Sequence, residues 1–398
     1  MLNKALLQPE VQEFINNNLK TDLPQLILRG SDFPQISIQE IATQIETKRK
    51  AEKKIPLWFS TENIIYPKSL NLEQTSSQIT ATYKAEQIEG ESLIDLTGGF
   101  GIDSFFFAEK FQKVIHCELN EELSQLVKHN FQYLSKKNNL EFYAGNGIDF
   151  LKNTNQIFDW IYIDPSRRNE VGGRVFRLED CEPNILLHLE LLLKHARNGV
   201  FMKTSPLLDL SLGLKELNFQ VEEIQIVAVN NDVKELLWKI TSEKNESKLS
   251  LKCINFNKEI PQEFKADFYN ETTAEVYYSE PLQYLYEPNA AILKGGFFYS
   301  VAEKFQLKKI APHSHLYTSE EKIEFSGRVF KIEEQLPFQK KSFKKLGITK
   351  ANVTTRNFPL SVEQIRKKLS IKDGGNTYLF FTTNSTNEKL ILICKKVY

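Results

Sequence analysis

The chain has 398 residues, of which 41% are hydrophobic and 26% are charged, and its 51 basic residues balance its 51 acidic residues. This is the composition of an ordinary globular protein of two or three domains, which argues against a disordered, fibrous or membrane-embedded chain. The formal net charge of zero also excludes a chain that attracts nucleic acid through its overall field, so any such attraction must be local.

Cysteine and histidine offer no special chemistry. The four cysteines form no CxxC pair and predict reduced, mostly buried thiols in a cytoplasmic protein; they are Cys117, Cys181, Cys253 and Cys394. The six histidines lack metal-ligand spacing, so we expect no metal. We also expect no signal peptide and no membrane span, because the most apolar stretch, 185–193, is too short to cross a bilayer.

The first 88 residues are predicted to form an N-terminal helical region. Helices are expected from Pro9, over 37–54 and over 72–88, and no strand-like alternation interrupts them.

From residue 89 to 245 the pattern changes to short β-rich runs that alternate with helical segments. Strands are expected over 93–95, 113–118, 140–144, 158–164 and 199–203, with helices near 101–110, 120–136 and 182–196. This alternation predicts an α/β domain with a doubly wound, Rossmann-like parallel sheet. Two further runs, 219–229 and 233–241, flank a short polar turn and predict a hairpin.

The remaining chain is predicted to contain a β-rich connecting region over 246–323 and a small α+β domain over 324–398. The second part holds a well-marked helix, in which Ser361 is the N-cap and Gln364 occupies the capping-box position. A C-terminal hairpin is expected from the runs 378–382 and 389–394.

The most informative stretch is the glycine-rich loop after the first predicted strand, which reads Asp95-Leu96-Thr97-Gly98-Gly99-Phe100-Gly101. Glycines let a ligand approach the backbone, and the helix that follows offers unpaired N–H groups, so the loop predicts nucleotide binding. It departs from the dinucleotide fingerprint, because Ser104 replaces the third glycine and Asp95 would repel a pyrophosphate. An acid at this place suits a cationic ligand.

Polar residues follow the next three strands in the same way. Glu118 ends the second strand, 23 residues after Asp95, where a carboxylate can accept hydrogen bonds from both hydroxyls of a ribose. Asn146 and Gly147 follow the third strand, and Asp164 follows the fourth. Four motifs in this order are more specific than any one of them alone.

The set resembles the cofactor site of class I S-adenosylmethionine-dependent methyltransferases, whose first motif, (D/E)-x-x-x-G-x-G, is matched by Asp95, Gly99 and Gly101. The resemblance implies S-adenosylmethionine as the cofactor, held by Glu118 and by loop residues Asp95, Thr97, Gly98, Gly99 and Gly101. It also implies an adenine contact at Asn146 and Gly147, although relatives commonly carry an aspartate where Asn146 stands.

The fourth strand is followed by Asp164-Pro165-Ser166-Arg167, at the place of the catalytic motif of such enzymes. Relatives that methylate nitrogen carry (D/N/S)-P-P-(Y/F) there, so Asp164 is expected to orient a base nitrogen, whereas Ser166 and Arg167 depart from the pattern. A guanidinium plane can also stack on a base or hold a phosphate. Methylation of carbon 5 of a pyrimidine is disfavoured, because the fifth strand end lacks the required cysteine nucleophile.

Two concentrations of positive charge are candidates for contacts with RNA. Arg167 and Arg168 lie beside the predicted chemistry, although an exposed loop whose charges pair with one another is the alternative. Between Lys340 and Lys372, ten basic residues accompany a single acid, which suits the phosphates of a nucleic acid, with a merely solvated surface as the alternative. The predicted RNA-binding residues are Arg168, Lys344, Lys345, Lys350, Arg356, Arg366 and Lys367.

The layout of nearly the whole chain resembles a bacterial family of class I methyltransferases with a small ferredoxin-like piece and a C-terminal THUMP-like domain. The matching stretches are 95–103, 164–168, 286–294 and 355–361. THUMP domains bind RNA, so the resemblance implies a methyltransferase acting on tRNA or rRNA, and we expect a base nitrogen as acceptor. The alternatives are a methyltransferase for a small molecule or protein, and an RNA-binding protein with a vestigial cofactor site.

Overall fold

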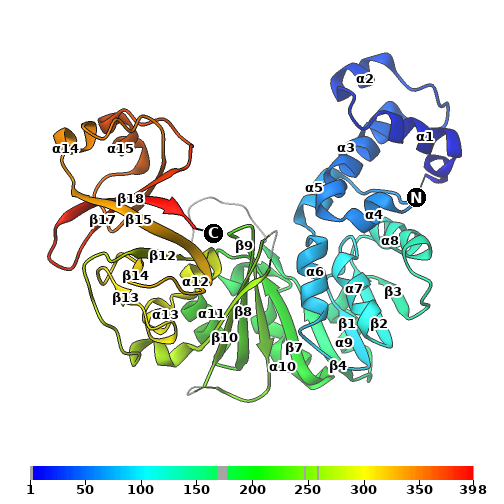
Figure 1. The fold of residues 1–398 in the computed structure, drawn as a ribbon. Coiled ribbons are helices and arrows are strands. Elements are labelled where there is room, and N and C mark those ends of the chain that lie inside the picture. Colours follow the sequence, from blue (N-terminus) through cyan, green and yellow to red (C-terminus); the bar gives the residue numbers. More distant parts are fainter. Residues whose placement is uncertain (1–2, 168–176, 246–247, 258–259, 398) are drawn as a thin grey trace. The chain divides into compact units, whose positions relative to one another are not determined.

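The computed structural model describes residues 3–167, 177–245, 248–257 and 260–397 (Figure 1). The chain divides into two compact units. The first comprises residues 1–220 and 238–244, and the second comprises residues 221–237 and 245–398. Arg168, one of the predicted RNA-binding residues, lies outside the described residues.

The first unit begins with a series of short helices. They are η1 (Lys4–Leu7), α1 (Pro9–Asn17), α2 (Leu23–Arg29), α3 (Ile38–Lys54), α4 (Pro56–Ser60), α5 (Ser69–Gln74) and α6 (Gln78–Ala85). The predicted helices from Pro9 and over 37–54 are confirmed, and Ser37 caps α3 in a capping box. The prediction of a single helix over 72–88 is wrong, because α5 ends at Gln74 and Ser77 caps a new helix, α6.

A parallel sheet follows these helices. Its strands are β1 (Ser92–Asp95), β2 (Lys113–Glu118), β3 (Leu140–Ala144), β4 (Phe158–Ile163) and β7 (Ala196–Thr204), in the spatial order β3-β2-β1-β4-β7. The helices between and after them are α7 (Ile102–Lys110), α8 (Glu121–Leu134), α9 (Gly147–Lys152), α10 (Ile185–His195) and α11 (Leu210–Glu216). This arrangement confirms the predicted doubly wound α/β fold. The strand order reverses at β1 and β4, and ligands bind beside the carboxyl ends of strands at such a point.

The N-terminal helices share a hydrophobic core with the sheet domain. Trp58 from α4 packs edge-on against Phe105 from α7, with ring centroids 5.0 Å apart, and belongs to one buried cluster with Phe131 of α8. Helix α6 lies against α7 (Figure 1). The helical region therefore helps to fix the position of α7, the helix that follows the glycine-rich loop.

The last two residues of the candidate catalytic motif form a short strand. Strand β5 (Ser166–Arg167) pairs antiparallel with β6 (Cys181–Glu182), which comes after η2 (Leu178–Asp180). The pairing ties the backbone of the motif to the start of the segment that leads into α10.

The second unit contains four strands of a nine-stranded sheet and the whole of a seven-stranded sheet. Its first strands are β8 (Val221–Val229), β9 (Asp232–Ile240), β10 (Ser250–Phe256) and β11 (Gln262–Asp267), followed by η3 (Phe268–Thr272). Of β9, the residues up to Leu237 belong to this unit. Their order is β11-β10-β8-β9. Asn230 and Asn231 link β8 to β9 with positive φ angles of 51° and 63°, which is the turn chemistry of a tight hairpin.

A seven-stranded sheet carries the C-terminal part of the second unit. The strands are β12 (Tyr284–Pro288), β13 (Lys308–Lys309), β14 (Tyr317–Ser319), β15 (Gly327–Pro337), β16 (Asn352–Arg356), β17 (Thr377–Thr383) and β18 (Lys389–Lys396). Their order is β13-β14-β12-β15-β18-β17-β16. The helices are α12 (Ala290–Gly295), α13 (Phe298–Lys304), α14 (Lys340–Lys344) and α15 (Val362–Leu369). The predicted capped helix and C-terminal hairpin are confirmed.

Within the described residues, no helix is both long enough and apolar enough to cross a membrane.

Candidate functional site

The first unit brings four predicted motifs to one edge of its sheet. Asp95, Glu118 and Asp164 stand at or directly after the carboxyl ends of β1, β2 and β4, and Asn146 follows β3 by two residues. Because these strands are parallel and adjacent, their carboxyl ends meet, and the candidate cofactor and catalytic residues lie together.

The three glycines of the loop have different roles. A Cβ on Gly98 would lie 2.3 Å from the His116 ring, and one on Gly101, whose φ is +76°, would lie 2.6 Å from Val127. Gly99 differs, because the nearest atom to its Cβ position is the Thr97 carbonyl oxygen at 3.9 Å. Gly98 and Gly101 are therefore required by packing, and Gly99 faces the open space into which a ligand can come close to the backbone.

His116 supports this loop from β2 and was not singled out by the sequence. It is fully buried, and burial lowers its pKa to about 4, so the ring is neutral at physiological pH. Its Nε2 lies 3.3 Å from the Gly99 carbonyl oxygen. A neutral imidazole that donates there fixes the loop without adding a charge beside the site.

Glu118 ties the end of β2 to the loop. One carboxylate oxygen accepts from the Gly99 N–H at 2.9 Å, and the other accepts from the Asn120 N–H at 2.8 Å. Each oxygen has a further lone pair, and the side chain is only partly buried. This carboxylate can therefore keep its backbone contacts and still accept from two vicinal hydroxyls.

Asp95 lies behind the loop. It is 1% exposed, and its carboxyl oxygens accept from the Thr97 N–H at 3.0 Å and from the Ser104 hydroxyl at 2.5 Å. Burial, helped by the neighbouring Asp103 and Asp164 carboxylates, raises its pKa to about 7 despite these two hydrogen bonds. The carboxyl therefore orders the loop and places a titratable charge beneath it.

Asn146 and Gly147 form the start of α9. The Asn146 side-chain oxygen accepts from the N–H groups of Ile148 at 2.8 Å and Asp149 at 3.4 Å, as an N-cap. A Cβ on Gly147 would lie 2.8 Å from the Leu96 carbonyl oxygen, so close packing accounts for this glycine. The amide oxygen proposed for adenine thus also has a structural task.

Asp164 is held at both its backbone and its side chain. Its N–H donates to the Thr97 hydroxyl at 2.7 Å, which joins the catalytic motif to the glycine-rich loop. Its carboxylate forms a salt bridge with Lys203, at the end of β7. Sequence reasoning missed Lys203; the available signal was a lysine at the end of a strand whose preceding residues are apolar. Of the neighbouring motif residues, Pro165 is buried and Ser166 is exposed.

A buried ion pair lies beside this site. Lys84 of α6 is 0% exposed, and its Nζ lies 3.2 Å from one oxygen of Asp103, in the first turn of α7. The other oxygen accepts from the hydroxyls of Tyr162 at 2.7 Å and Ser76 at 2.9 Å. Burial alone would raise the pKa of Asp103, but the charges of Lys84 and Lys203 together with the hydrogen bonds from Tyr162 and Ser76 hold that pKa below its ordinary value.

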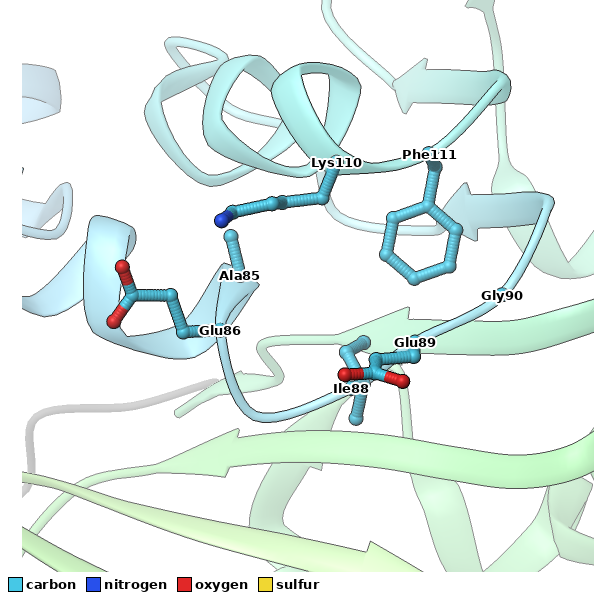
Figure 2. Close-up of a pocket in the computed structure, with 7 residues that line it drawn as sticks. All are labelled: Ala85, Glu86, Ile88, Glu89, Gly90, Lys110 and Phe111. Atoms are coloured by element: carbon cyan, nitrogen blue, oxygen red, sulfur yellow. The ribbon is translucent and has the colours of Figure 1, made fainter.

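A separate shallow pocket lies away from these residues. Figure 2 shows Lys110 and Phe111 at the end of α7 above the segment that leads from α6 into β1; the pocket is lined by Ala85, Glu86, Ile88, Glu89, Gly90, Lys110 and Phe111. It therefore lies at the amino end of β1, opposite the edge that carries Asp164. In the described part of the chain, no three His, Cys, Asp or Glu side chains are grouped to hold a metal.

The predicted RNA-binding residues of the second unit fall into two groups. Lys344, Lys345 and Lys367 are exposed and form no salt bridge with any described residue, and Lys350 is exposed beside Gly374. Arg366 instead forms a salt bridge with Asp373.

Arg356 belongs with Arg366, because it is also paired. Its guanidinium donates to Glu287 at 2.9 Å, and Glu287 is 3% exposed and also forms a salt bridge with Arg328. Arg356 therefore neutralises a buried carboxylate that lies in a different strand of the same sheet.

Comparisons with known proteins cover the chain in parts and as a whole. A ferredoxin-like domain model matches residues 284–325, and a "THUMP domain-like" model matches residues 327–396, which confirms the C-terminal resemblance. The chain is 31% identical to a protein of Porphyromonas gingivalis W83, described from its crystal structure as a "putative methyltransferase"; the alignment covers 100% of each chain with a TM-score of 0.88.

A second relative matches over a shorter stretch. The chain is 29% identical over 145 residues to an "Uncharacterized RNA methyltransferase" of Thermotoga maritima. That alignment covers 33% of this chain and 33% of the Thermotoga protein, so the chain spans about a third of that relative's length.

Proposed function

This chain belongs to the family of methyltransferases that includes the Porphyromonas gingivalis protein, and we propose that it transfers a methyl group from S-adenosylmethionine to RNA. The observation that carries the proposal is the set of polar groups at the carboxyl ends of β1, β2 and β4, around a loop in which Gly99 alone of the three glycines faces open space. Membership of this family supports methyl transfer as the reaction, and the arrangement of these polar groups supports the carboxyl ends of β1, β2 and β4 as its site.

The residues present fit S-adenosylmethionine. Glu118 would accept from the ribose hydroxyls, the Gly99 backbone would allow close approach, and Asn146 with Gly147 would border the adenine. When ionised, the buried Asp95 supplies negative charge beneath the loop, which suits a ligand that carries an ammonium and a sulfonium. When bound, the cofactor supplies an electrophilic methyl group, and the protein's task is to align the acceptor with it.

Asp164 is proposed to orient the acceptor, a base nitrogen, by accepting its hydrogen. The Thr97 hydroxyl holds the Asp164 backbone against the cofactor loop, which favours a fixed distance between the two reactants. All four cysteines are buried, and Cys181, the nearest to the motif in sequence, is 0% exposed. Their burial supports chemistry at nitrogen over the covalent route to a pyrimidine carbon.

RNA is proposed to bind through the second unit. The THUMP-like match covers α14 and α15, and the exposed Lys344 and Lys367 lie in these helices, with the exposed Lys345 directly after α14. Exposed cations that form no salt bridge with a described residue are suited to phosphate contacts, and tRNA or rRNA in the cytoplasm is the proposed substrate.

Two measurements test this function. Calorimetry should detect binding of S-adenosylmethionine, and an Asp95→Lys variant should abolish it. RNA binding should weaken steeply with added salt, and a salt-insensitive or absent association would contradict the RNA assignment. Methylation of a small molecule or a protein in place of RNA would favour the alternative acceptor classes, and an absence of cofactor binding would indicate a vestigial site.

A further inference from the structure

The carboxylate proposed to orient the acceptor is already in contact with a cation. Lys203 forms a salt bridge with Asp164, and their side chains are 12% and 30% exposed, respectively. Both groups come from the carboxyl ends of neighbouring strands, β7 and β4. An ammonium in this position acts on any acceptor atom that Asp164 contacts, because solvent screens a partly buried pair less than an exposed one.

A second carboxylate favours the charged form of Lys203. Asp103 is held in place by the hydroxyls of Tyr162 and Ser76 and by Lys84, and the positive charges of Lys84 and Lys203 lower its pKa. Lys203 therefore lies near two carboxylates, Asp103 and Asp164, and attraction to both stabilises its ammonium form.

Base nitrogens respond to such an ammonium in two opposite ways. An exocyclic amine of adenine, cytosine or guanine gains positive charge as it attacks a methyl group, and a neighbouring ammonium opposes that charge. The ring N–H of guanine or uracil instead loses a proton before attack, and negative charge spreads to the adjacent carbonyl oxygen. An ammonium beside that oxygen stabilises the developing charge.

We propose that Asp164 and Lys203 together bind the ring N–H and the adjacent carbonyl of guanine or uracil in RNA. The inference rests on the proposed function and names its acceptor class. Asp164 accepts the ring N–H and takes its proton, while Lys203 donates to the carbonyl oxygen on which the electron pair of the broken N–H bond accumulates. The ring nitrogen then forms the bond to the methyl group, and the electrons of the sulfur–methyl bond remain on sulfur as a neutral thioether.

The product identifies the acceptor directly. The full-length protein is incubated with S-adenosylmethionine that carries a labelled methyl group and with total RNA from cells that lack the gene, and the digested nucleosides are analysed by mass spectrometry. Label in 1-methylguanosine or 3-methyluridine supports the proposal. Label on an exocyclic amine, on a ring carbon or on ribose overturns it while the proposed function stands; no label in RNA refutes both.

Variants of Lys203 test its part in the reaction. K203M should lower kcat by about 100-fold, because it removes one donor from the developing charge, while affinity for S-adenosylmethionine stays within twofold of wild type. K203R keeps a cation and should recover at least tenfold of that loss. The control is K215M, which removes an exposed lysine of α11 and should keep wild-type activity.

A merely structural role for Lys203 has a different outcome. K203M and K203R would then lose activity equally, and cofactor affinity would fall with it. Either that result or a K203M kcat within threefold of wild type would overturn the role assigned to Lys203.

Discussion

Replacing Asp95 by Asn should stabilise the protein without ligand, and the gain should grow with pH. Burial raises the pKa of Asp95 from 3.8 to about 7, so the folded state keeps a proton that the unfolded chain has lost between these values. The contribution of Asp95 to stability is therefore highest below about pH 4 and falls as the pH rises towards 7. Asn has nearly the same shape, can still accept from the Thr97 N–H and carries no charge to bury.

The magnitude follows from the size of the pKa change. One pH unit is worth about 1.4 kcal/mol, so ionised Asp95 destabilises the fold by on the order of 4 kcal/mol above pH 7. Between pH 5 and pH 8 the wild-type protein should lose about 3 kcal/mol relative to D95N, because only the interval from 5 to about 7 contributes. Other titrating groups are common to both proteins and cancel in the comparison.

Urea unfolding followed by tryptophan fluorescence measures this difference. All three tryptophans, Trp58, Trp160 and Trp238, lie in the first unit, so the signal reports the unit that contains Asp95. D95N should gain on wild type from pH 5 to pH 8, while its affinity for S-adenosylmethionine falls at least tenfold through loss of the charge beneath the loop. A stability gap that is constant with pH would refute the buried, proton-retaining carboxyl.

Three further predictions concern separate parts of the molecule. G98A should lower the free energy of unfolding of the first unit by about 2 kcal/mol or more, because its methyl group would meet the His116 ring. G99A should cost only about 1 kcal/mol of stability, through its φ of +53°, and should mainly weaken cofactor binding. Urea unfolding measures the stability of each variant, and calorimetry measures its cofactor binding. R356A should lower the free energy of unfolding by about 1–3 kcal/mol, because the buried Glu287 loses one of its two cations. Calorimetric unfolding checks this. An unchanged unfolding temperature together with weaker RNA binding would assign Arg356 to RNA instead. The triple variant K344A/K345A/K367A should reduce the slope of log affinity for RNA against log salt by about 3, with unchanged binding of S-adenosylmethionine in calorimetry; an unchanged slope would remove these lysines from the interface.

The sequence predicted the sheet of the first unit well because its strands are short apolar runs followed by polar or glycine residues. That pattern was enough to place Asp95, Glu118 and Asp164 at one edge, since parallel strands align their carboxyl ends. Ser361 likewise identified α15 through a local capping box. The cofactor and catalytic roles of Asp95, Glu118 and Asp164 remain proposals.

The contacts that the sequence did not reveal connect distant parts of the chain. Lys203 meets Asp164 across 39 residues, and Arg356 meets Glu287 across 69 residues. Neither pairing has a local periodicity or motif, because both depend on which strands become neighbours in the folded chain. The run of basic residues between Lys340 and Lys372 therefore showed where positive charge is concentrated in the sequence. It could not distinguish the exposed lysines from Arg356, which neutralises a buried acid.

Asp164 is the residue on which the proposed acceptor chemistry most depends, and methyl transfer to RNA tests it directly. The full-length protein and its D164A variant are incubated with labelled S-adenosylmethionine and total RNA from cells that lack the gene, and label in purified nucleosides is counted. We expect a methylated nucleoside with wild type and at least a 100-fold slower reaction with D164A, although both bind the cofactor. Cofactor binding by both proteins without label in RNA, or equal rates with and without the Asp164 carboxylate, would contradict it.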